Sequence, residues 1–276
     1  MSTEAKRIGA LIPVRLRSER LPGKALRMLS GRPVIYHLLD RVAACRYIED
    51  VRDVVVCTTQ HASDDPLASA VEHYGASVFR GHPDDIIERF ANAMEVHDFD
   101  AVVQADGDDP LSATEFMDVT METLLQAQST SPPAGIVTVS GVPLGCATKS
   151  FTREAMRTVL RSYRTNRNDT GFIYFFTRSG LVKHIDIECN PATLQHPHAR
   201  LTLDYELDLK LFEAVFDALY QTGELFGLAD TVTFLRNNPE LAALNLSVED
   251  EYWQRTADKV ELTYVDDHGI ERVITQ

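Results

Sequence analysis

A short stretch near the amino terminus gathers basic residues that could bind an anion. Arg15, Arg17, Arg20 and Lys24 fall within ten residues that hold a single acid, Glu19. This is unusual in a chain whose formal net charge is −14. Guanidinium and ammonium groups at this density suit a polyanion such as a nucleoside triphosphate. The alternative is a basic loop exposed to solvent.

A second cluster carries the opposite charge. Asp106, Asp108 and Asp109 fall within four residues, followed by Pro110. Three carboxylates this close repel one another unless a cation or a basic group offsets them. Mg²⁺ usually takes one or two protein carboxylates and leaves its other positions to water and phosphates. The alternative is an acidic turn, because Asp-Gly and Asp-Pro favour turns. We favour the metal site, because a parallel sheet could bring the basic loop to the same edge as these carboxylates.

A third acid, Asp204, ends the run Arg200-Leu-Thr-Leu-Asp204 directly before a helical pattern. An aspartate at this position could cap the amino terminus of that helix. It could also be a second metal ligand that converges on Asp108 from a distant part of the chain. The sequence pattern leaves both alternatives open.

The elements that position these residues can be predicted from apolar runs. The basic loop follows the run 8–13 and the acidic cluster follows the run 101–105, and both runs are typical of buried strands. In an open parallel sheet, ligands bind at the carboxyl ends of such strands. Further strands are predicted at 54–59, 76–79, 136–139, 172–176, 182–187 and 201–204, and helices at 33–46, 64–74, 84–97, 114–128, 151–163, 206–220 and 227–236.

The alternation of strands and helices predicts an α/β fold with a doubly wound, mostly parallel sheet. Strands 172–176 and 182–187 are expected to build a smaller mixed-sheet lobe. Because no long linker interrupts the chain, residues 1–276 are predicted to form a single domain, with residues 140–200 as this lobe. We expect Thr152 to cap the helix 151–163 and Gly75 to end the helix 64–74.

Composition narrows the class of protein. The chain has 276 residues, of which 44% are hydrophobic and 25% charged, which is ordinary for a globular protein. Its negative charge weighs against binding to nucleic acid or to an anionic membrane. The four cysteines are widely spaced without a C-x-x-C pair, as expected of reduced residues in a cytoplasmic protein. The apolar run near residue 8 is too short for a signal peptide, and no segment is long enough to span a membrane.

The stretch 12–24, which reads Ile-Pro-Val-Arg-Leu-Arg-Ser-Glu-Arg-Leu-Pro-Gly-Lys, resembles the signature of the sugar-acid cytidylyltransferases. These include the ketodeoxyoctonate and acylneuraminate enzymes and the related spore-coat polysaccharide proteins. The segments 58–67, 79–90, 107–111 and 200–209 are similar to motifs of the spore-coat branch in the same order. The resemblance covers residues 8–215. It implies a Rossmann-like fold of the nucleotide-diphospho-sugar transferase type and an enzyme that uses CTP, requires Mg²⁺ and releases pyrophosphate.

The resemblance also implies roles for individual residues. Arg15 and Lys24 would grip the triphosphate and act in catalysis with Asp108, and Asp108 and Asp204 would hold Mg²⁺. The nucleotide-binding residues that it implies are Pro13, Arg15, Ser18, Arg20, Lys24, Asp84 and Asp106. Such a site works by positioning the reactants and by stabilising charge on the phosphates, with little need for a general base when the nucleophile is an anion.

Two departures from the family pattern concern the acceptor. Where the family often has an acidic run, this chain has Lys149, which favours anions over hydroxyl groups. A usual arginine-glutamate-histidine motif is replaced by Arg167-Asn-Asp169-Thr. We therefore expect Lys149, Arg167 and Asp169 to contact a small anionic acceptor such as a sugar acid, a phosphonate or a phosphate. The alternative is that Lys149 is a surface residue.

Other functions stay open from the sequence. A glycosyltransferase could use Asp106-x-Asp108 to hold a nucleotide-sugar, and a non-catalytic nucleotide-binding protein could keep the same fold. The resemblance also suggests a homodimer formed through the 140–200 lobe. We expect Tyr252 and Trp253 to pack or to lie at a subunit interface, and the tail after Asn238 has no assigned role.

Overall fold

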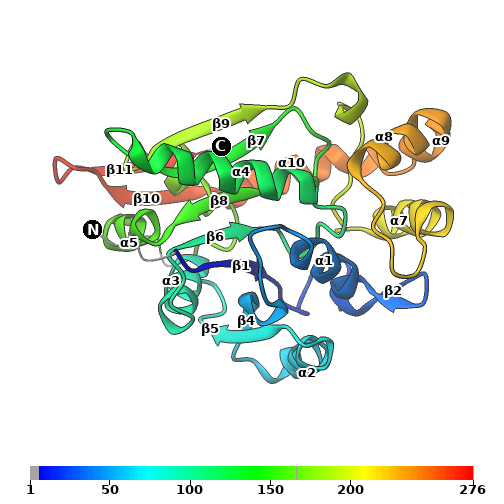
Figure 1. Ribbon diagram of the computed structural model, residues 1–276, viewed down its shortest axis with the longest axis horizontal. Coiled ribbons are helices and arrows are strands. Elements are labelled where there is room, and N and C mark those ends of the chain that lie inside the picture. Colours follow the sequence, from blue (N-terminus) through cyan, green and yellow to red (C-terminus); the bar gives the residue numbers. More distant parts are fainter. Residues whose placement is uncertain (1–5, 166, 276) are drawn as a thin grey trace.

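A seven-stranded sheet forms the centre of the structure, a computed structural model that describes residues 6–165 and 167–275 (Figure 1). The strand order is β5-β4-β1-β6-β8-β7-β9. All neighbours are parallel except β8, which runs antiparallel to both β6 and β7. The strands are β1 (Ile8–Pro13), β4 (Val54–Thr59), β5 (Ser77–Gly81), β6 (Ala101–Gln104), β7 (Ala134–Ser140), β8 (Lys149–Thr152) and β9 (Lys183–Glu188).

Helices cover both faces of this sheet. One face packs against α1 (Val34–Ala43), α2 (Asp65–Tyr74) and α4 (Thr114–Gln126). The other packs against α3 (Ile86–Val96), α5 (Arg153–Ser162), α6 (Tyr174–Thr177) and the hairpin β10 (Glu261–Val265) and β11 (Glu271–Thr275). Along β1, Ala10 and Ile12 face the first layer and Leu11 faces the second. Because successive side chains of a strand point to opposite faces, a continuous apolar strand indicates burial on both sides.

A third apolar cluster lies at the end of the sheet where α7, α8 and α9 gather (Figure 1). These helices span Glu206–Leu219, Leu228–Asn237 and Pro239–Ala242, and they are followed by α10 (Glu249–Lys259). The remaining elements are the short ribbon β2 (Met28–Leu29) and β3 (Arg32–Pro33), and 3₁₀ turns at Lys24–Leu26, Val51–Asp53, Ala62–Asp64, Ala127–Ser129, Ala192–Leu194 and Leu246–Val248.

The predicted fold class is confirmed, and several elements match closely. Strand β4 has the predicted bounds, and α2 ends at Gly75 with a positive φ of 102°. Thr152 caps α5 by accepting a hydrogen bond from the Ala155 N–H. Within the described residues, no helix is both long and apolar enough to cross a membrane. The expectation of buried, reduced cysteines is confirmed for all four of them.

Three local predictions are wrong. Residues 172–176 are not a strand but lead into the single turn α6, and residues 201–204 form no strand of the sheet. The chain at 149–152 is the strand β8, whereas we expected a helix to begin at Phe151. The strands of the second half, β7, β8 and β9, continue the central sheet, and the small antiparallel pairs lie beside it. The expectation about a signal peptide rests partly on residues 1–5, which lie outside the described residues.

Candidate active site

The basic and acidic loops face the same cleft, which has a volume of about 470 Å³. They leave the carboxyl ends of β1 and β6, which pair in parallel, so both loops start at one edge of the sheet. Gly107 allows them to touch. A Cβ atom at this position would lie 2.2 Å from the Val14 side chain and 2.4 Å from the Pro13 carbonyl oxygen. The missing side chain therefore lets the acidic loop lie directly against the basic one.

Two backbone hydrogen bonds bring Asp204 to this edge from a distant part of the chain. The Leu201 N–H donates to the Leu144 carbonyl at 2.7 Å, and the Leu203 N–H donates to the Asp108 carbonyl at 2.8 Å. The second bond joins the segment directly to the acidic loop. The predicted convergence of Asp204 on Asp108 is therefore present in the structure.

Lys24 lies at the centre of the three charged segments. Its Nζ is 2.8 Å from Asp108 Oδ2 and 2.9 Å from Asp204 Oδ1, and Arg20 also pairs with Asp204. Although burial opposes it, the charges of Asp108 and Asp204 raise the pKa of Lys24. Against the same effect of burial, Lys24 and Arg20 lower the pKa of Asp204. Lys24 and Asp204 therefore stay charged near neutral pH.

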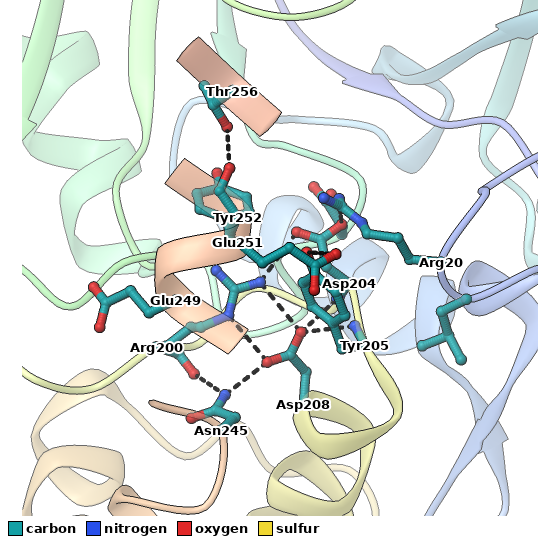
Figure 2. Close-up of polar contacts among 12 residues, drawn as sticks. Arg20, Arg200, Asp204, Tyr205, Asp208, Asn245, Glu249, Glu251, Tyr252 and Thr256 are labelled. Carbon is teal, nitrogen blue, oxygen red and sulfur yellow. Dashed lines mark hydrogen bonds and ion pairs between the residues drawn. The ribbon is translucent and has the colours of Figure 1, made fainter. Parts of the chain in front are cut away.

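The alternative that Asp204 caps a helix is wrong. Helix α7 is capped from inside by Asp208, which accepts hydrogen bonds at 2.8 Å from the N–H groups of Asp204 and Tyr205. The buried Arg200 pairs with both carboxylates, at 3.2 Å from Asp204 Oδ2 and 3.1 Å from Asp208 Oδ1 (Figure 2). The Asp204 carboxylate thus lines the cleft, where Arg20 and Lys24 pair with its Oδ1.

Lys149 belongs to the cleft, so the alternative that it is a surface residue is wrong. Its side chain is only 13% exposed, and its Nζ lies 2.6 Å from Asp106 Oδ2. The antiparallel register of β6 and β8 places Lys149 opposite Gln104, which donates to Asp106 at 2.9 Å. Against the effect of burial, the charge of Lys149 lowers the pKa of Asp106.

Not all of the residues predicted for the site reach the cleft. Pro13, Arg15, Ser18 and Asp169 are among the described residues that line it, whereas Asp84 and Arg167 are not. Each of those two pairs with a residue that does line it. Arg15 pairs with Asp169 at 2.6 Å and with Asp84 at 3.4 Å, and Arg167 pairs with Asp169 at 2.9 Å.

Comparison with known proteins identifies the family. The family model described as "Cytidylyltransferase" matches residues 9–222. The chain belongs to the cytidylyltransferase family. The resemblance noted in the sequence is thereby confirmed, and with it the expected class of enzyme, a nucleotidyltransferase that uses CTP.

Relatives of this cytidylyltransferase match over different lengths. The spore coat polysaccharide biosynthesis protein SpsF of Bacillus subtilis is 24% identical over 235 residues, which cover 84% of this chain and 95% of the relative. A 3-deoxy-manno-octulosonate cytidylyltransferase of Sodalis glossinidius is 28% identical over 175 residues, or 62% and 61% of the two chains. The solved structure of a cytidylyltransferase from Leptospira borgpetersenii matches with a TM-score of 0.76 at 22% identity. The match covers 86% of this chain and 97% of that structure, which supports the α/β fold described above.

The carboxylates of the cytidylyltransferase cleft fit a magnesium ion. Burial and the neighbouring acids raise the pKa of Asp108, against the charge of Lys24. Burial, Asp108 and Asp106 raise the pKa of Asp109, whose Oδ1 has no hydrogen-bond partner within residues 6–165 and 167–275. The same part of the chain contains no group of three or more metal-binding side chains. Two carboxylates suit Mg²⁺, which takes its other ligands from water and phosphates.

Helix α10 supplies residues of the cleft that the sequence motifs did not reveal. Tyr252, Trp253, Arg255, Thr256 and Lys259 line it. We expected Tyr252 and Trp253 to serve in packing or at an interface. The Tyr252 ring in fact packs over the guanidinium group of Arg200 at 4.3 Å, so it both packs and lines the cleft. The one signal in the sequence is the spacing of 252, 256 and 259, which places these residues on one face of a helix.

Proposed function

We propose that this enzyme is a Mg²⁺-dependent cytidylyltransferase that transfers CMP from CTP to a small anionic acceptor and releases pyrophosphate. The acceptor would be a sugar acid, a phosphonate or a phosphate, used in polysaccharide or phosphonate biosynthesis. The single observation that carries the proposal is the position of Lys24. Its Nζ is shared by Asp108 and Asp204 in the cleft where the loops after β1 and β6 meet. A buried cation beside two carboxylates suits a site for a metal-bound triphosphate.

In the reaction, an acceptor oxygen forms a bond to the α-phosphorus of CTP. The bond from that phosphorus to the bridging oxygen breaks, and pyrophosphate leaves with the electron pair. Where the attacking oxygen is itself deprotonated, as on a phosphate or phosphonate, no proton has to be removed and the chain needs no general base. Its task is to orient the reactants and to stabilise charge on the phosphate oxygens.

The residues of the cleft divide this task. Asp108 and Asp204 would hold Mg²⁺, which supplies positive charge to the phosphates when bound. Lys24, Arg15 and Arg20 would bind phosphate oxygens and stabilise the charge that develops on the leaving pyrophosphate. Asp169 holds the Arg15 guanidinium at 2.6 Å and so fixes its direction.

The function is tested by measuring pyrophosphate release with each nucleoside triphosphate, Mg²⁺ and a panel of acceptors. We expect release with CTP and an anionic acceptor. If no member of a broad panel supports release with CTP, the proposal fails. A nucleotide-sugar-dependent glycosyltransferase or a non-catalytic nucleotide-binding protein would then be the better assignment.

We propose further that the chain is a single nucleotidyltransferase domain in which residues 140–200 bind the acceptor. The support is Lys149, whose ammonium group lies at 2.6 Å from Asp106 beside the proposed metal carboxylates. Asp169, held by Arg167 at 2.9 Å, would complete this acceptor site. Lys149→Ala should reduce turnover of anionic acceptors more than turnover of neutral ones. An equal loss for both classes would contradict the role of Lys149 in recognising an anion.

We also propose that the enzyme is a cytoplasmic homodimer that binds neither nucleic acid nor membranes. Four buried, free cysteines support a reducing compartment, and the net charge of −14 disfavours polyanionic partners. Strand β9, within the 140–200 segment, is an edge of the sheet and offers unpaired backbone groups for assembly. Light scattering after gel filtration should give twice the mass of one chain, and a monomer would contradict the dimer.

A further inference from the structure

Helix α10 forms one wall of the cleft although it lies outside the region that the family model matches. That region ends at residue 222, and α10 begins at Glu249. No residue of the helix is buried, which is unusual for a helix packed against a domain. Its inner face instead lines the cleft through Tyr252, Arg255 and Lys259. The shared catalytic core is therefore completed by a segment that the family model does not cover.

The position of α10 is fixed from its first turns. The Tyr252 ring lies over the Arg200 guanidinium group at 4.3 Å, and the Tyr205 hydroxyl donates to Glu251 at 3.2 Å. Arg200 is itself held by Asp208, so the anchor is rigid (Figure 2). The residues one and two turns further along the helix are consequently presented to the cleft in a defined direction.

The cations of α10 face the basic loop across the cleft. Arg255 Nη2 donates to Glu19 Oε2 at 2.5 Å. Lys259 lies close enough that its charge, more than that of Arg255, lowers the pKa of the exposed Glu19 carboxyl. Glu19 stands between Ser18 and Arg20, inside the loop proposed to bind the triphosphate. Arg255 and Lys259 are therefore directed at the place where the outer phosphates would lie.

The charge balance of the cleft depends on these two residues. Basic side chains outnumber acidic ones among the residues that line it, and the two sets become equal if Arg255 and Lys259 are left out. Four basic residues of the shared core, Arg15, Arg20, Lys24 and Lys149, are already paired with acids. Arg15 binds Asp169, and Lys24 binds Asp108. In a protein with a net charge of −14, α10 thus supplies the excess of positive charge that a polyanion requires.

We propose that Arg255 and Lys259 bind the β- and γ-phosphates of the nucleotide, with phosphate oxygens replacing the Glu19 carboxylate as the partner of Arg255. Guanidinium and phosphate groups form strong, charge-assisted hydrogen bonds, so this exchange favours the nucleotide. The identity of the nucleotide as CTP rests on the proposed function. The subsite itself recognises the pyrophosphate unit of the substrate, and it would hold the pyrophosphate product in the same way.

Calorimetric titration of CTP and CMP tests the subsite, because CMP lacks the two outer phosphates. We expect the double variant Arg255→Gln/Lys259→Gln to bind CTP roughly 10- to 100-fold more weakly, as for loss of hydrogen bonds to a charged group, and to bind CMP like the wild type. Lys210→Gln is the matched control, because it removes a positive charge from an exposed position of α7 that does not line the cleft. It should leave both affinities unchanged.

Trp253 provides a check on the structure of the variants. It is the only tryptophan of the chain and lies on α10, so its emission reports on this helix alone. An unchanged emission spectrum in the double variant would show that α10 keeps its place. Glu19→Gln should have the opposite effect and tighten CTP binding about 2- to 5-fold, in the range of a lost surface ion pair, because it releases Arg255 for the phosphates.

Two results would overturn the proposal. One is a CTP affinity of the double variant equal to that of the wild type, and the other is an equal loss of affinity for CTP and CMP. Titration with inorganic pyrophosphate separates this proposal from the proposed function. If the wild type binds pyrophosphate, the double variant does not, and CTP binds no better than other nucleoside triphosphates, then the α10 subsite stands and the assignment to CTP fails.

Discussion

Two clusters of charged side chains lie next to each other and differ in how they use their charges. We call Lys24, Asp108 and Asp204 the open cluster, because all three line the cleft; Lys24 and Asp108 are 14% and 31% exposed, and Asp204 is 2% exposed. Arg200, Asp208 and Asn245 form the closed cluster, in which Arg200 and Asp208 are at most 1% exposed. They meet at Asp204, which the closed cluster holds from behind (Figure 2).

The clusters differ in their hydrogen bonds. Asp208 accepts from Arg200, from Asn245 at 2.7 Å and from two backbone N–H groups, so its charge is well compensated. Asp108 has Lys24 as its cation, and burial together with nearby acids raises its pKa. A compensated buried charge is a feature of a scaffold, whereas an uncompensated one is typical of a functional site. We therefore expect substitutions in the closed cluster to reduce stability and those in the open cluster to reduce activity.

The largest expected effect on stability is that of Asp208→Ala. It leaves the Arg200 guanidinium group buried without its main partner and removes the internal cap of α7. Loss of one partner of a buried ion pair costs about 3–5 kcal/mol. Urea unfolding should show this decrease in the free energy of unfolding. Glu213→Ala, at an exposed position of the same helix, should change it little. A loss below about 1 kcal/mol would mean that the closed cluster is not a scaffold.

Lys24→Ala should have the largest effect on activity. Lys24 is the cation shared by both carboxylates of the open cluster. Loss of one preorganised charge at the transition state costs roughly 10²-fold or more in kcat/KM. We expect this reduction for CTP in steady-state kinetics, with Lys210→Ala as the control. A kcat/KM value close to that of the wild type would contradict the assignment of the phosphate site to this loop.

Asp108→Asn should change stability in the opposite direction to Asp208→Ala. The pKa of Asp108 is raised in the folded protein, so the ionised carboxylate reduces stability at neutral pH, and stability is regained as pH falls through the folded pKa. A neutral asparagine removes that cost. In EDTA at pH 7 we expect a Tm about 2–4 °C higher than that of the wild type, together with a loss of activity in Mg²⁺. A lower Tm would show that the Lys24 pair outweighs the repulsion.

Features that depend on local patterns could be predicted from the sequence. Strand β4 is a compact run of mostly β-branched residues, and α2 carries Pro66 at its start and Gly75 at its end, so the bounds of α2 follow from backbone chemistry. The loops after β1 and β6 could be placed at one edge because parallel strands align their carboxyl ends. The acids and bases that meet there could therefore be proposed as a single site.

Features that depend on tertiary contacts could not be predicted. Strand β8 has only four residues and continues into the cap of α5, so it shows no period of its own. The aromatic residues at 172–176 form a helical turn instead, and their rings pack into the same apolar cluster as α3 and α5. The roles of Asp208 and Arg255 depend on partners far away in the sequence, Asn245 for Asp208 and Glu19 for Arg255.

The smallest expected effect concerns the pH dependence of stability. It tests whether the open cluster is independent of the rest of the protein. Buried His37 donates from Nε2 to the Leu29 carbonyl at 2.9 Å, and burial lowers its pKa. The folded protein therefore binds a proton at His37 less readily than the unfolded chain does, so this residue reduces stability as pH falls below about 6.5. The raised pKa of Asp108 has the opposite sign, because protonation of that carboxyl favours the folded state.

His37→Gln keeps a donor for the Leu29 carbonyl but cannot titrate. Between pH 7 and pH 5, its Tm should decrease less than that of the wild type when both are measured in EDTA. The same substitution in the Asp108→Asn background should give the same difference, because the two groups belong to separate parts of the core. If the difference changed in that background, His37 and the open cluster would be coupled, and the open cluster could not be treated as an independent functional unit.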